Sequence, residues 1–254
     1  MSALLEGANL RVAVPGRVLV DEFDCAVHSG EFIALLGGNG TGKSLLLRTL
    51  AGLRPADGGA VRLDRQGIAG LPRRMIATRL GFLPQDPDAP PQGTLFDSVL
   101  LGRYSHLGFW EVNGRQDEER AMQALRDVGL GSLGARELAT LSGGEQRRAA
   151  IARLLVQAPS IYLLDEPTNH LDPAQQLGIL EQLRALARAG ASVVASLHDP
   201  NLALRFADRI WLLSGAGDVT NITAEDLAAS HLAQLYGIDY AETRAGKHRF
   251  MVPA

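Results

Sequence analysis

The sequence predicts an α/β fold with a mainly parallel central sheet, an antiparallel β subdomain and an inserted helical subdomain. The first support is a set of short apolar runs without alternation, a pattern typical of parallel strands buried on both faces. These runs are residues 32–36, 161–164, 193–197 and 210–213. The second is that helical segments separate the runs, which indicates a parallel sheet. The third is the loss of strand signals between about residues 87 and 158.

Shorter β-rich segments, broken by Gly and Pro, mark the N-terminal part as antiparallel. They are residues 10–14, 18–20 and 60–63. Asp172-Pro173 and Asp199-Pro200 each pair an N-cap acceptor with a proline at the first helical position, so we expect a helix after each.

The long stretch without strands carries apolar faces at helical spacing over 117–128, and a second helix is expected over 145–157. We therefore expect one domain over 1–254. Its core would comprise about 1–86 and 159–254, and its helical subdomain about 87–158.

Composition narrows the class of protein. The chain has 254 residues, of which 46% are hydrophobic and 21% charged, as in ordinary globular proteins. A net charge of −3 gives no basic excess that would favour nucleic acid. No apolar run approaches the ~20 residues of a membrane span, and the first residues do not resemble a signal peptide. The single cysteine, Cys25, excludes an internal disulfide and fits a reducing cytoplasm.

A glycine-rich loop follows the first buried run and matches G-x-x-x-x-G-K-[ST]. Its residues are Gly37, Gly38, Asn39, Gly40, Thr41, Gly42, Lys43 and Ser44. Glycines let successive N–H groups turn toward phosphate oxygens, and the helix that begins near Lys43 adds its positive end. Lys43 would reach the β- and γ-phosphates of ATP, and the Ser44 hydroxyl would bind Mg²⁺. The alternative is a glycine-rich turn that contains a lysine. The buried strand before it and the helix after it favour a P-loop NTPase core.

Asp165 and Glu166 follow the run 161–164, at the edge of the sheet where such folds bind ligands. Asp165 would hold Mg²⁺, and Glu166 would accept a proton from the attacking water or orient it. By itself, an Asp-Glu pair after a strand is as typical of an ordinary turn as of a catalytic site. Together with the glycine loop it predicts a nucleotide hydrolase.

The segment 141–145 has the sequence Leu-Ser-Gly-Gly-Glu. Ser142 and Glu145 alone would form a capping box at the start of the next helix. Gly143 and Gly144 weaken a helix start, and they suit a phosphate that approaches bare backbone N–H groups. The pentapeptide resembles the signature of ABC ATPases, and the whole chain from residue 4 onward resembles their nucleotide-binding domain.

The resemblance implies roles for three further positions. Gln85 would be the glutamine that senses Mg²⁺ and links the site to the helical subdomain. Asp172 would belong to the D-loop (169–172), although a helix N-cap also explains it. His198 would be the switch histidine at the γ-phosphate; it alone among six histidines follows a buried strand directly.

Two positions depart from the family pattern. Val14 stands where an aromatic residue usually stacks on adenine, and Leu45 stands where a threonine usually contacts the α-phosphate. Neither change affects the γ-phosphate chemistry.

The resemblance also implies partners. Ser142, Gly143, Gly144 and Glu145 of one subunit would cap ATP held by a second copy, so the chain would act as a homodimer. A separate integral membrane permease would be needed, together with an extracytoplasmic substrate-binding protein. The chain would lie peripherally on the cytoplasmic face of the inner membrane.

Two segments indicate a subtype. Residues 102–108 are similar to a segment in ATPases of metal-chelate importers, and residues 232–237 resemble the tail of cobalamin-importer ATPases. The alternatives are an ordinary surface helix and a docked tail. We expect vitamin B12 to be the transported molecule, with a ferric siderophore or haem ranked second. A soluble ABC ATPase, for example in Fe–S cluster assembly, is the competing function.

Overall fold

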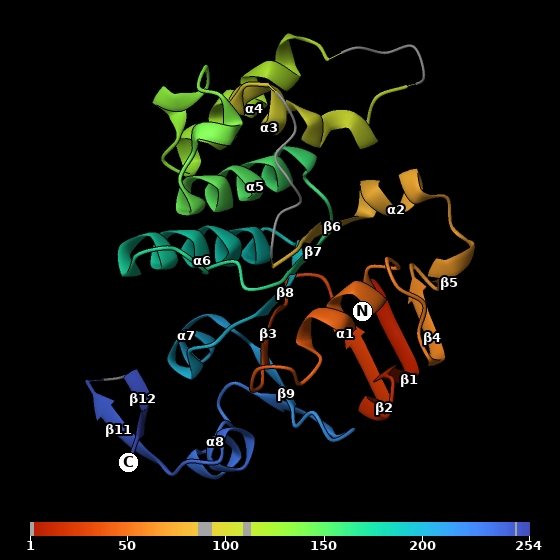
Figure 1. Ribbon diagram of the computed structural model, residues 1–254, viewed down its shortest axis with the longest axis vertical. Coiled ribbons are helices and arrows are strands. Elements are labelled where there is room, and N and C mark those ends of the chain that lie inside the picture. The colour runs from red at the N-terminus through yellow and green to blue at the C-terminus, as the bar shows by residue number, and fades with distance from the viewer. Residues whose placement is uncertain (1–2, 86–92, 109–112, 247) are drawn as a thin grey trace.

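A computed structural model of the chain describes residues 3–85, 93–108, 113–246 and 248–254 (Figure 1). Its centre is a six-stranded sheet with the order β10-β9-β3-β8-β7-β6. The strands are β3 (Phe32–Leu36), β6 (Leu80–Leu83), β7 (Ile161–Leu164), β8 (Ser192–Ser196), β9 (Arg209–Leu213) and β10 (Val219–Thr223). All neighbours pair in parallel except β10, which is antiparallel to β9. The predicted parallel sheet is confirmed; the antiparallel β10 was not predicted as one of its strands.

A second, antiparallel sheet covers one face of the central sheet and has the order β2-β1-β4-β5. Its strands are β1 (Leu5–Val14), β2 (Arg17–Val27), β4 (Gly58–Leu63) and β5 (Gln66–Gly67). β1 and β2 are longer than predicted. The ring of Phe23 on β2 meets Trp211 on β9 edge-on, with centroids 5.3 Å apart, and this contact joins the two sheets.

Strands β3 and β7 are apolar throughout because both of their faces are buried. On β3, Phe32, Ala34 and Leu36 belong to the core shared with the helices on one side. Ile33 and Leu35 belong to the core shared with α1 (Lys43–Leu50) and the antiparallel sheet. The absence of alternation in the sequence therefore has a direct packing cause.

Helices make up most of the described chain between β6 and β7. They are α3 (Leu95–Leu100), α4 (Arg115–Asp127) and α5 (Gly143–Gln157), joined by the 3-10 helices η2 (Leu101–Ser105), η3 (Gly131–Leu133) and η4 (Leu138–Thr140). The described residues 93–108 and 113–158 contain no strand. This group forms the upper end of the molecule in Figure 1. The predicted start of the helical subdomain, near residue 87, lies outside the described residues.

The remaining elements surround the sheet. They are η1 (Ile68–Gly70), α2 (Arg73–Arg79), α6 (Pro173–Arg188), α7 (Pro200–Phe206), α8 (Ala229–Tyr236) and a hairpin of β11 (Tyr240–Ala245) and β12 (His248–Pro253). Asp172 and Asp199 cap α6 and α7 as predicted, each accepting a backbone N–H bond. The hairpin was not predicted.

Parallel pairing brings the carboxyl ends of four strands to one edge. The glycine loop follows β3, Gln85 follows β6, Asp165 follows β7, and His198 follows β8. The sheet topology therefore gathers residues that are far apart in the sequence.

Candidate functional site

The glycine loop turns sharply before it enters α1. Gly40 and Gly42 have φ angles of 71° and 102°, which side chains rarely tolerate. A Cβ on Gly42 would lie 3.0 Å from the Cβ of Leu19, so this position is also tight. Thr41 Oγ1 donates to the Gly38 carbonyl at 2.9 Å and closes the turn.

Lys43 lies folded back over this loop and is only 6% exposed. Its Nζ donates to the carbonyls of Gly37 at 2.8 Å and Gly38 at 3.0 Å. Burial lowers the pKa of Lys43, and the nearby carboxylates of Glu166 and Asp165 oppose that shift. The loop thus holds a buried ammonium group beside two carboxylates.

Asp165 is fully buried at the end of β7. Its Oδ1 accepts from Ser196 Oγ at 2.8 Å. Its Oδ2 is buried without a hydrogen-bond partner in the described part of the chain. Burying a carboxylate oxygen without a partner costs free energy unless a cation binds it. This oxygen is therefore suited to bind Mg²⁺, directly or through water.

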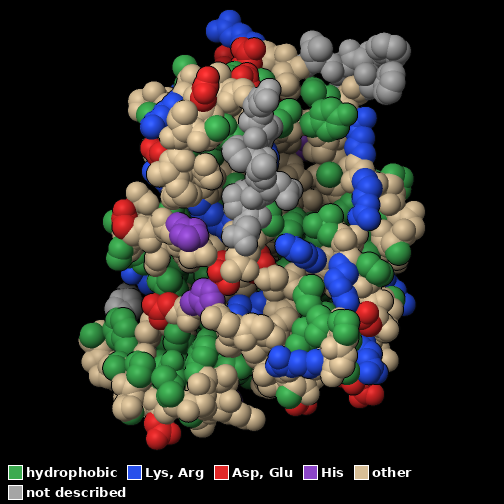
Figure 2. Space-filling view, viewed as in Figure 1, with side chains coloured by type: hydrophobic (Ala, Val, Ile, Leu, Met, Phe, Trp, Pro, Cys, Tyr) green, Lys and Arg blue, Asp and Glu red, His purple; other side chains and the backbone are tan. Residues whose placement is uncertain are grey.

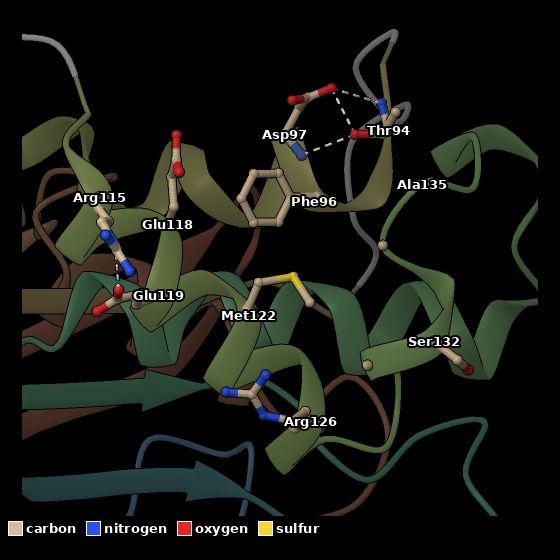
Figure 3. A pocket seen from close by; sticks show the side chains of 12 residues that line it. Thr94, Phe96, Asp97, Arg115, Glu118, Glu119, Met122, Arg126, Ser132 and Ala135 are labelled. Atoms are coloured by element: carbon tan, nitrogen blue, oxygen red, sulfur yellow. Dashed lines mark hydrogen bonds and ion pairs between the residues drawn. The ribbon is translucent and has the colours of Figure 1, made fainter.

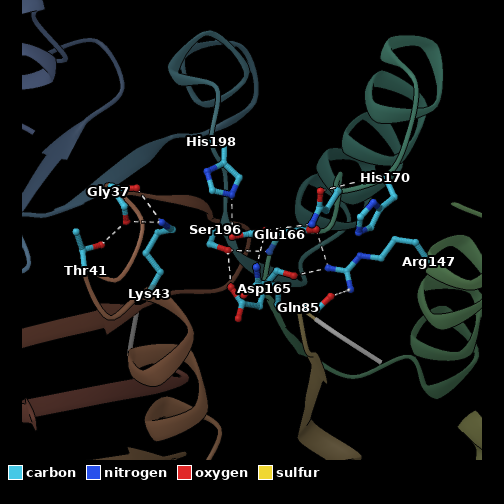
Figure 4. Close-up of polar contacts among 12 residues, drawn as sticks. Gly37, Thr41, Lys43, Gln85, Arg147, Asp165, Glu166, His170, Ser196 and His198 are labelled. Atoms are coloured by element: carbon cyan, nitrogen blue, oxygen red, sulfur yellow. Dashed lines mark hydrogen bonds and ion pairs between the residues drawn. The ribbon is translucent and has the colours of Figure 1, made fainter. Parts of the chain in front are cut away.

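Glu166 is held from several sides, as Figure 4 shows. Its Oε1 lies 2.7 Å from His198 Nε2. Its Oε2 accepts from Gln85 Nε2 at 3.1 Å and from Asn169 Nδ2 at 3.3 Å. Its backbone N–H donates to Ser196 Oγ at 2.7 Å, and its φ of 49° is left-handed. These contacts fix the Glu166 carboxylate beside the glycine loop.

One cleft of about 640 Å³ unites most of the predicted residues. It is lined by Asn39, Gly40, Thr41, Gly42, Lys43, Ser44, Gln85, Glu166 and His198, and also by Val14, Arg17, Leu19, Leu45 and Asn169. Gly37 and Gly38 accept the Lys43 bonds, and Asp165 lies behind the cleft wall. Figure 2 shows histidine and acidic side chains near the middle of this face.

The signature segment is not among the described residues that line this cleft. Ser142 is the N-cap of α5, where its Oγ accepts from the Glu145 N–H and Glu145 accepts from the Ser142 N–H at 2.8 Å. The capping box therefore exists. Asp172 likewise lies outside the cleft, as the N-cap of α6.

The two glycines of this segment differ in their surroundings. A Cβ on Gly144 would come within 2.9 Å of the His170 carbonyl, so packing requires glycine there. A Cβ on Gly143 would meet no described atom within 4 Å. Of the two glycines, Gly143 has no packing explanation among the described residues.

Two contributors were missed from the sequence. Ser196 joins the Asp165 carboxylate to the Glu166 backbone, and its only signal was a hydroxyl within an apolar strand. Arg147, on α5, donates to backbone carbonyls beside the cleft. Its charge at a core-facing helical position was the available signal.

A second cleft, of about 740 Å³, lies among α3, α4 and η3 (Figure 3). Phe96 and Met122 form its apolar floor, and Arg115 pairs with Glu119 at 2.9 Å on its rim. No predicted site residue lines it. The residues predicted for ATP hydrolysis gather instead in the smaller cleft at the sheet edge.

The helices described in the structure include none with the length and apolar character that a membrane crossing requires.

Comparisons with known proteins agree with this geometry. The sequence profile of the ABC transporter family matches residues 20–169. The hemin import ATP-binding protein HmuV of Rhodopseudomonas palustris is 43% identical over 224 residues, which cover 85% of this chain and 81% of that protein. The probable siderophore transport system ATP-binding protein YusV of Bacillus subtilis is 40% identical, over 76% of this chain and 70% of that protein.

Solved structures show the same fold. An inward-facing ABC transporter assigned to the metal-chelate type superposes with a TM-score of 0.84 and 28% identity, covering 100% of this chain and 98% of that one. The dimeric structure of MJ0796, a bacterial ABC transporter cassette, superposes with a TM-score of 0.79 and 28% identity, covering 88% and 100%. The chain therefore belongs to the ABC transporter family, as one of its ATP-binding subunits.

Proposed function

We propose that this chain is the ATP-hydrolysing subunit of an importer for an iron chelate, hemin or a ferric siderophore. The observation that carries the ATPase assignment is the single cleft that joins Lys43 to Glu166, Gln85 and His198, with Asp165 behind it. A phosphate-binding cation and a fixed carboxylate at one sheet edge are what hydrolysis of a nucleoside triphosphate requires.

The glycine loop binds the phosphates through its N–H groups, and Lys43 exchanges its two carbonyl contacts for phosphate oxygens. Ser44 and Asp165 would hold Mg²⁺, with Gln85 beside them. Mg²⁺, when bound, neutralises charge on the phosphate oxygens. The orphaned Oδ2 of Asp165 supports this placement.

Glu166 acts as the base toward the attacking water, and Gln85, Asn169 and His198 orient its carboxylate. His198 is half exposed on the open side of the cleft, whereas the Glu166 side chain is only 9% exposed. His198 can therefore turn from Glu166 to a γ-phosphate oxygen without disturbing the core.

The active unit is a homodimer. Ser142, Gly143 and the N–H groups at the start of α5 lie outside their own cleft, so they are free to cap ATP held by a second copy. The dimeric structure of MJ0796 supports this arrangement. Within each subunit, residues 1–254 act as one ATPase domain with a helical subdomain at about 87–158.

A second groove, of about 650 Å³, is separate from the nucleotide cleft and is lined in part by β6. It fits a loop of the permease. It is lined by apolar Leu53, Ile76 and Phe82 and by basic Arg48, Arg73 and Arg153. Figure 2 shows basic side chains over this flank of the molecule, near α1 and α2. Leu53, Met75, Leu101 and Tyr104 expose between 48% and 77% of their surface. Exposed apolar side chains of this size suit a permanent partner.

The segment that resembles metal-chelate importers is tied to α4 and α5 by its glycine, arginine and histidine residues. A Cβ on Gly102 would come within 2.2 Å of the Arg153 carbonyl, so glycine is required there. Arg103 bonds Asp117 at 2.8 Å, and His106 contacts the Gln157 carbonyl at 2.7 Å. These contacts present Tyr104, 77% exposed, toward a partner.

The names of the relatives favour hemin or siderophore as the transported chelate. Cobalamin, which the segments 102–108 and 232–237 favoured first, stays a prediction and ranks below these two. An extracytoplasmic binding protein would deliver the chelate. The chain would then lie peripherally on the cytoplasmic face of the inner membrane.

Co-purification tests the transport assignment. Solubilised membranes should yield the chain together with a polytopic permease, and hemin or siderophore should stimulate its ATPase when the binding protein is present. Tyr104→Asp should release the chain from the permease, whereas Ile238→Asp, exposed on the opposite end, should not. ATP-analogue binding by both variants controls for folding. A chain that hydrolyses ATP but never associates with a permease would favour the soluble alternative.

A further inference from the structure

Arg147 is a buried arginine to which the proposed ATPase mechanism assigns no role. It lies on α5, five positions after Ser142, and only 2% of the residue is exposed. A buried guanidinium is costly unless its donors are satisfied. Its hydrogen bonds therefore identify what it holds.

Four of those bonds go to backbone carbonyls at two strand ends. Nη1 donates to Pro84 O at 2.5 Å and to Gln85 O at 3.1 Å, just beyond β6. Nη2 donates to Asp165 O and, at 2.7 Å, to Glu166 O, just beyond β7. One planar group thus spans two neighbouring loops, as Figure 4 shows.

The same two loops meet a second time through their side chains. Gln85 Nε2 donates to Glu166 Oε2 at 3.1 Å. Arg147 fixes the backbone of both partners in this bond. A shift of either loop would move the Glu166 carboxylate relative to the glycine loop.

We propose that Arg147 is a positioning residue that sets Glu166 against Gln85 for hydrolysis and ties both to the signature segment at the start of α5. The inference rests on the proposed ATPase function. It extends that function, because α5 carries Ser142 at its N-terminus and Arg147 about one turn later. Movement of α5 toward ATP of the second copy therefore reaches the Glu166 backbone of the same chain.

The geometry explains why the residue is arginine. A guanidinium presents several donors in a fixed plane, so it can bond two pairs of carbonyls at once. A lysine ammonium is a single point and reaches one pair well. A glutamine is too short and has only two donors.

Arg148 provides a matched control on the same helix. Its Nη1 donates to Val128 O at 3.0 Å and to Gly129 O at 3.5 Å, away from the cleft. Arg148→Gln removes two bonds from α5 to backbone carbonyls, against four for Arg147→Gln, without touching the loops at Gln85 and Glu166.

The test compares Arg147→Gln, Arg147→Lys and Arg148→Gln in the full-length chain. Arg147→Gln should lower kcat by about 10²-fold, the scale of loss when a catalytic group is misplaced by about 1 Å, while the Kd for MgATP changes by less than about threefold. Arg147→Lys should recover part of kcat. Arg148→Gln should keep kcat near the wild-type value, and melting temperatures of all three report on folding.

Hydrogen exchange gives a readout that is independent of turnover. The N–H of Asp165 bonds Leu83 O, and the N–H of Glu166 bonds Ser196 Oγ. Exchange in the peptide that contains them should rise in nucleotide-free Arg147→Gln and stay unchanged in Arg148→Gln.

Equal losses of kcat in Arg147→Gln and Arg148→Gln would overturn the proposal, because both would then act through α5 stability. A normal kcat in folded Arg147→Gln, or no recovery with lysine and no change in exchange, would also overturn it. If Arg147→Gln does not fold, Arg147→Lys against Arg148→Lys repeats the comparison. Failure of the ATPase assignment itself looks different: Glu166→Gln would then hydrolyse ATP as fast as wild type.

Discussion

The imidazole of His198 meets the carboxylate of Glu166 with only 2.7 Å between Nε2 and Oε1, although the two residues follow different strands, β8 and β7. The histidine approaches from solvent and the glutamate from the core. A phosphate oxygen that enters the cleft competes with Glu166 for the same nitrogen. On the proposed function, the pair would therefore respond to the γ-phosphate, and binding of ATP would release Glu166 from His198.

Glu166→Gln separates binding from chemistry. The amide keeps the shape of the side chain and its contact with Gln85, but it cannot accept a proton from water. Hydrolysis should fall by about 10²–10⁴-fold while MgATP still binds. Single-turnover hydrolysis and equilibrium binding measure the two effects, and the variant should accumulate as an ATP-bound dimer. Turnover at the wild-type rate would exclude Glu166 as the base.

Lys43→Ala should abolish tight MgATP binding, because it removes the buried cation opposite the β- and γ-phosphates. Binding of a fluorescent ATP analogue checks this. Unchanged affinity would contradict the assignment of the phosphate loop.

The wild-type protein should also lose ATP affinity on the alkaline side. Burial lowers the pKa of Lys43 below its usual 10.5, against the opposing effect of Glu166 and Asp165. The charged form binds phosphate, so affinity should be full below that lowered pKa and decline as pH rises through it. Titrations from neutral to alkaline pH measure the decline, with circular dichroism to confirm folding. A decline that begins no earlier than for an exposed lysine would show that burial does not govern this group.

Mixing two inactive variants should restore ATP binding if the nucleotide site is shared between subunits. Ser142→Arg spoils the signature segment and Lys43→Ala spoils the phosphate loop. A heterodimer of the two has one composite site with both parts intact, so one tightly bound ATP per heterodimer is expected. Zero occupancy in verified heterodimers would refute the shared site, and occupancy must be measured because both sites could be needed for turnover.

Cys25 should be unreactive in the native protein. Burial raises the pKa of its thiol to about 12, against a smaller lowering by the Gly7 backbone, and the thiolate is the reactive form. Maleimide should label the chain only after denaturation. A Cys25→Ser chain that carries Tyr104→Cys is the control and should label quickly, because Tyr104 is exposed. Rapid labelling of native Cys25 would show that the first strands open easily.

The sequence predicted the elements whose burial leaves a clear pattern. The runs of β3 and β7 are apolar on both faces, and the loop and carboxylates that follow them carry recognisable chemistry. The β11–β12 hairpin was missed because β11 is exposed almost throughout, so its side chains alternate too weakly to mark a strand. β10 was missed for a similar reason, since its pattern is mostly polar.

Within the site, local motifs could be predicted and long-range bonds could not. Ser196 and Arg147 act through partners 18 to 63 residues away in sequence, and no spacing rule connects them. The packing role of Gly144 was not predicted. Its contact with the His170 carbonyl depends on how α5 packs on the loop before α6, which the sequence does not show.

That contact affects how substitutions in diverged relatives should be interpreted. A chain that had lost its ATPase would still need glycine at position 144, because the His170 carbonyl occupies the space of a side chain. Position 143 has no such constraint from the described part of its own subunit, so an inactive copy could acquire a larger residue there and still fold. Gly143, rather than the glycine pair, is then the position whose loss would mark a degenerate nucleotide site.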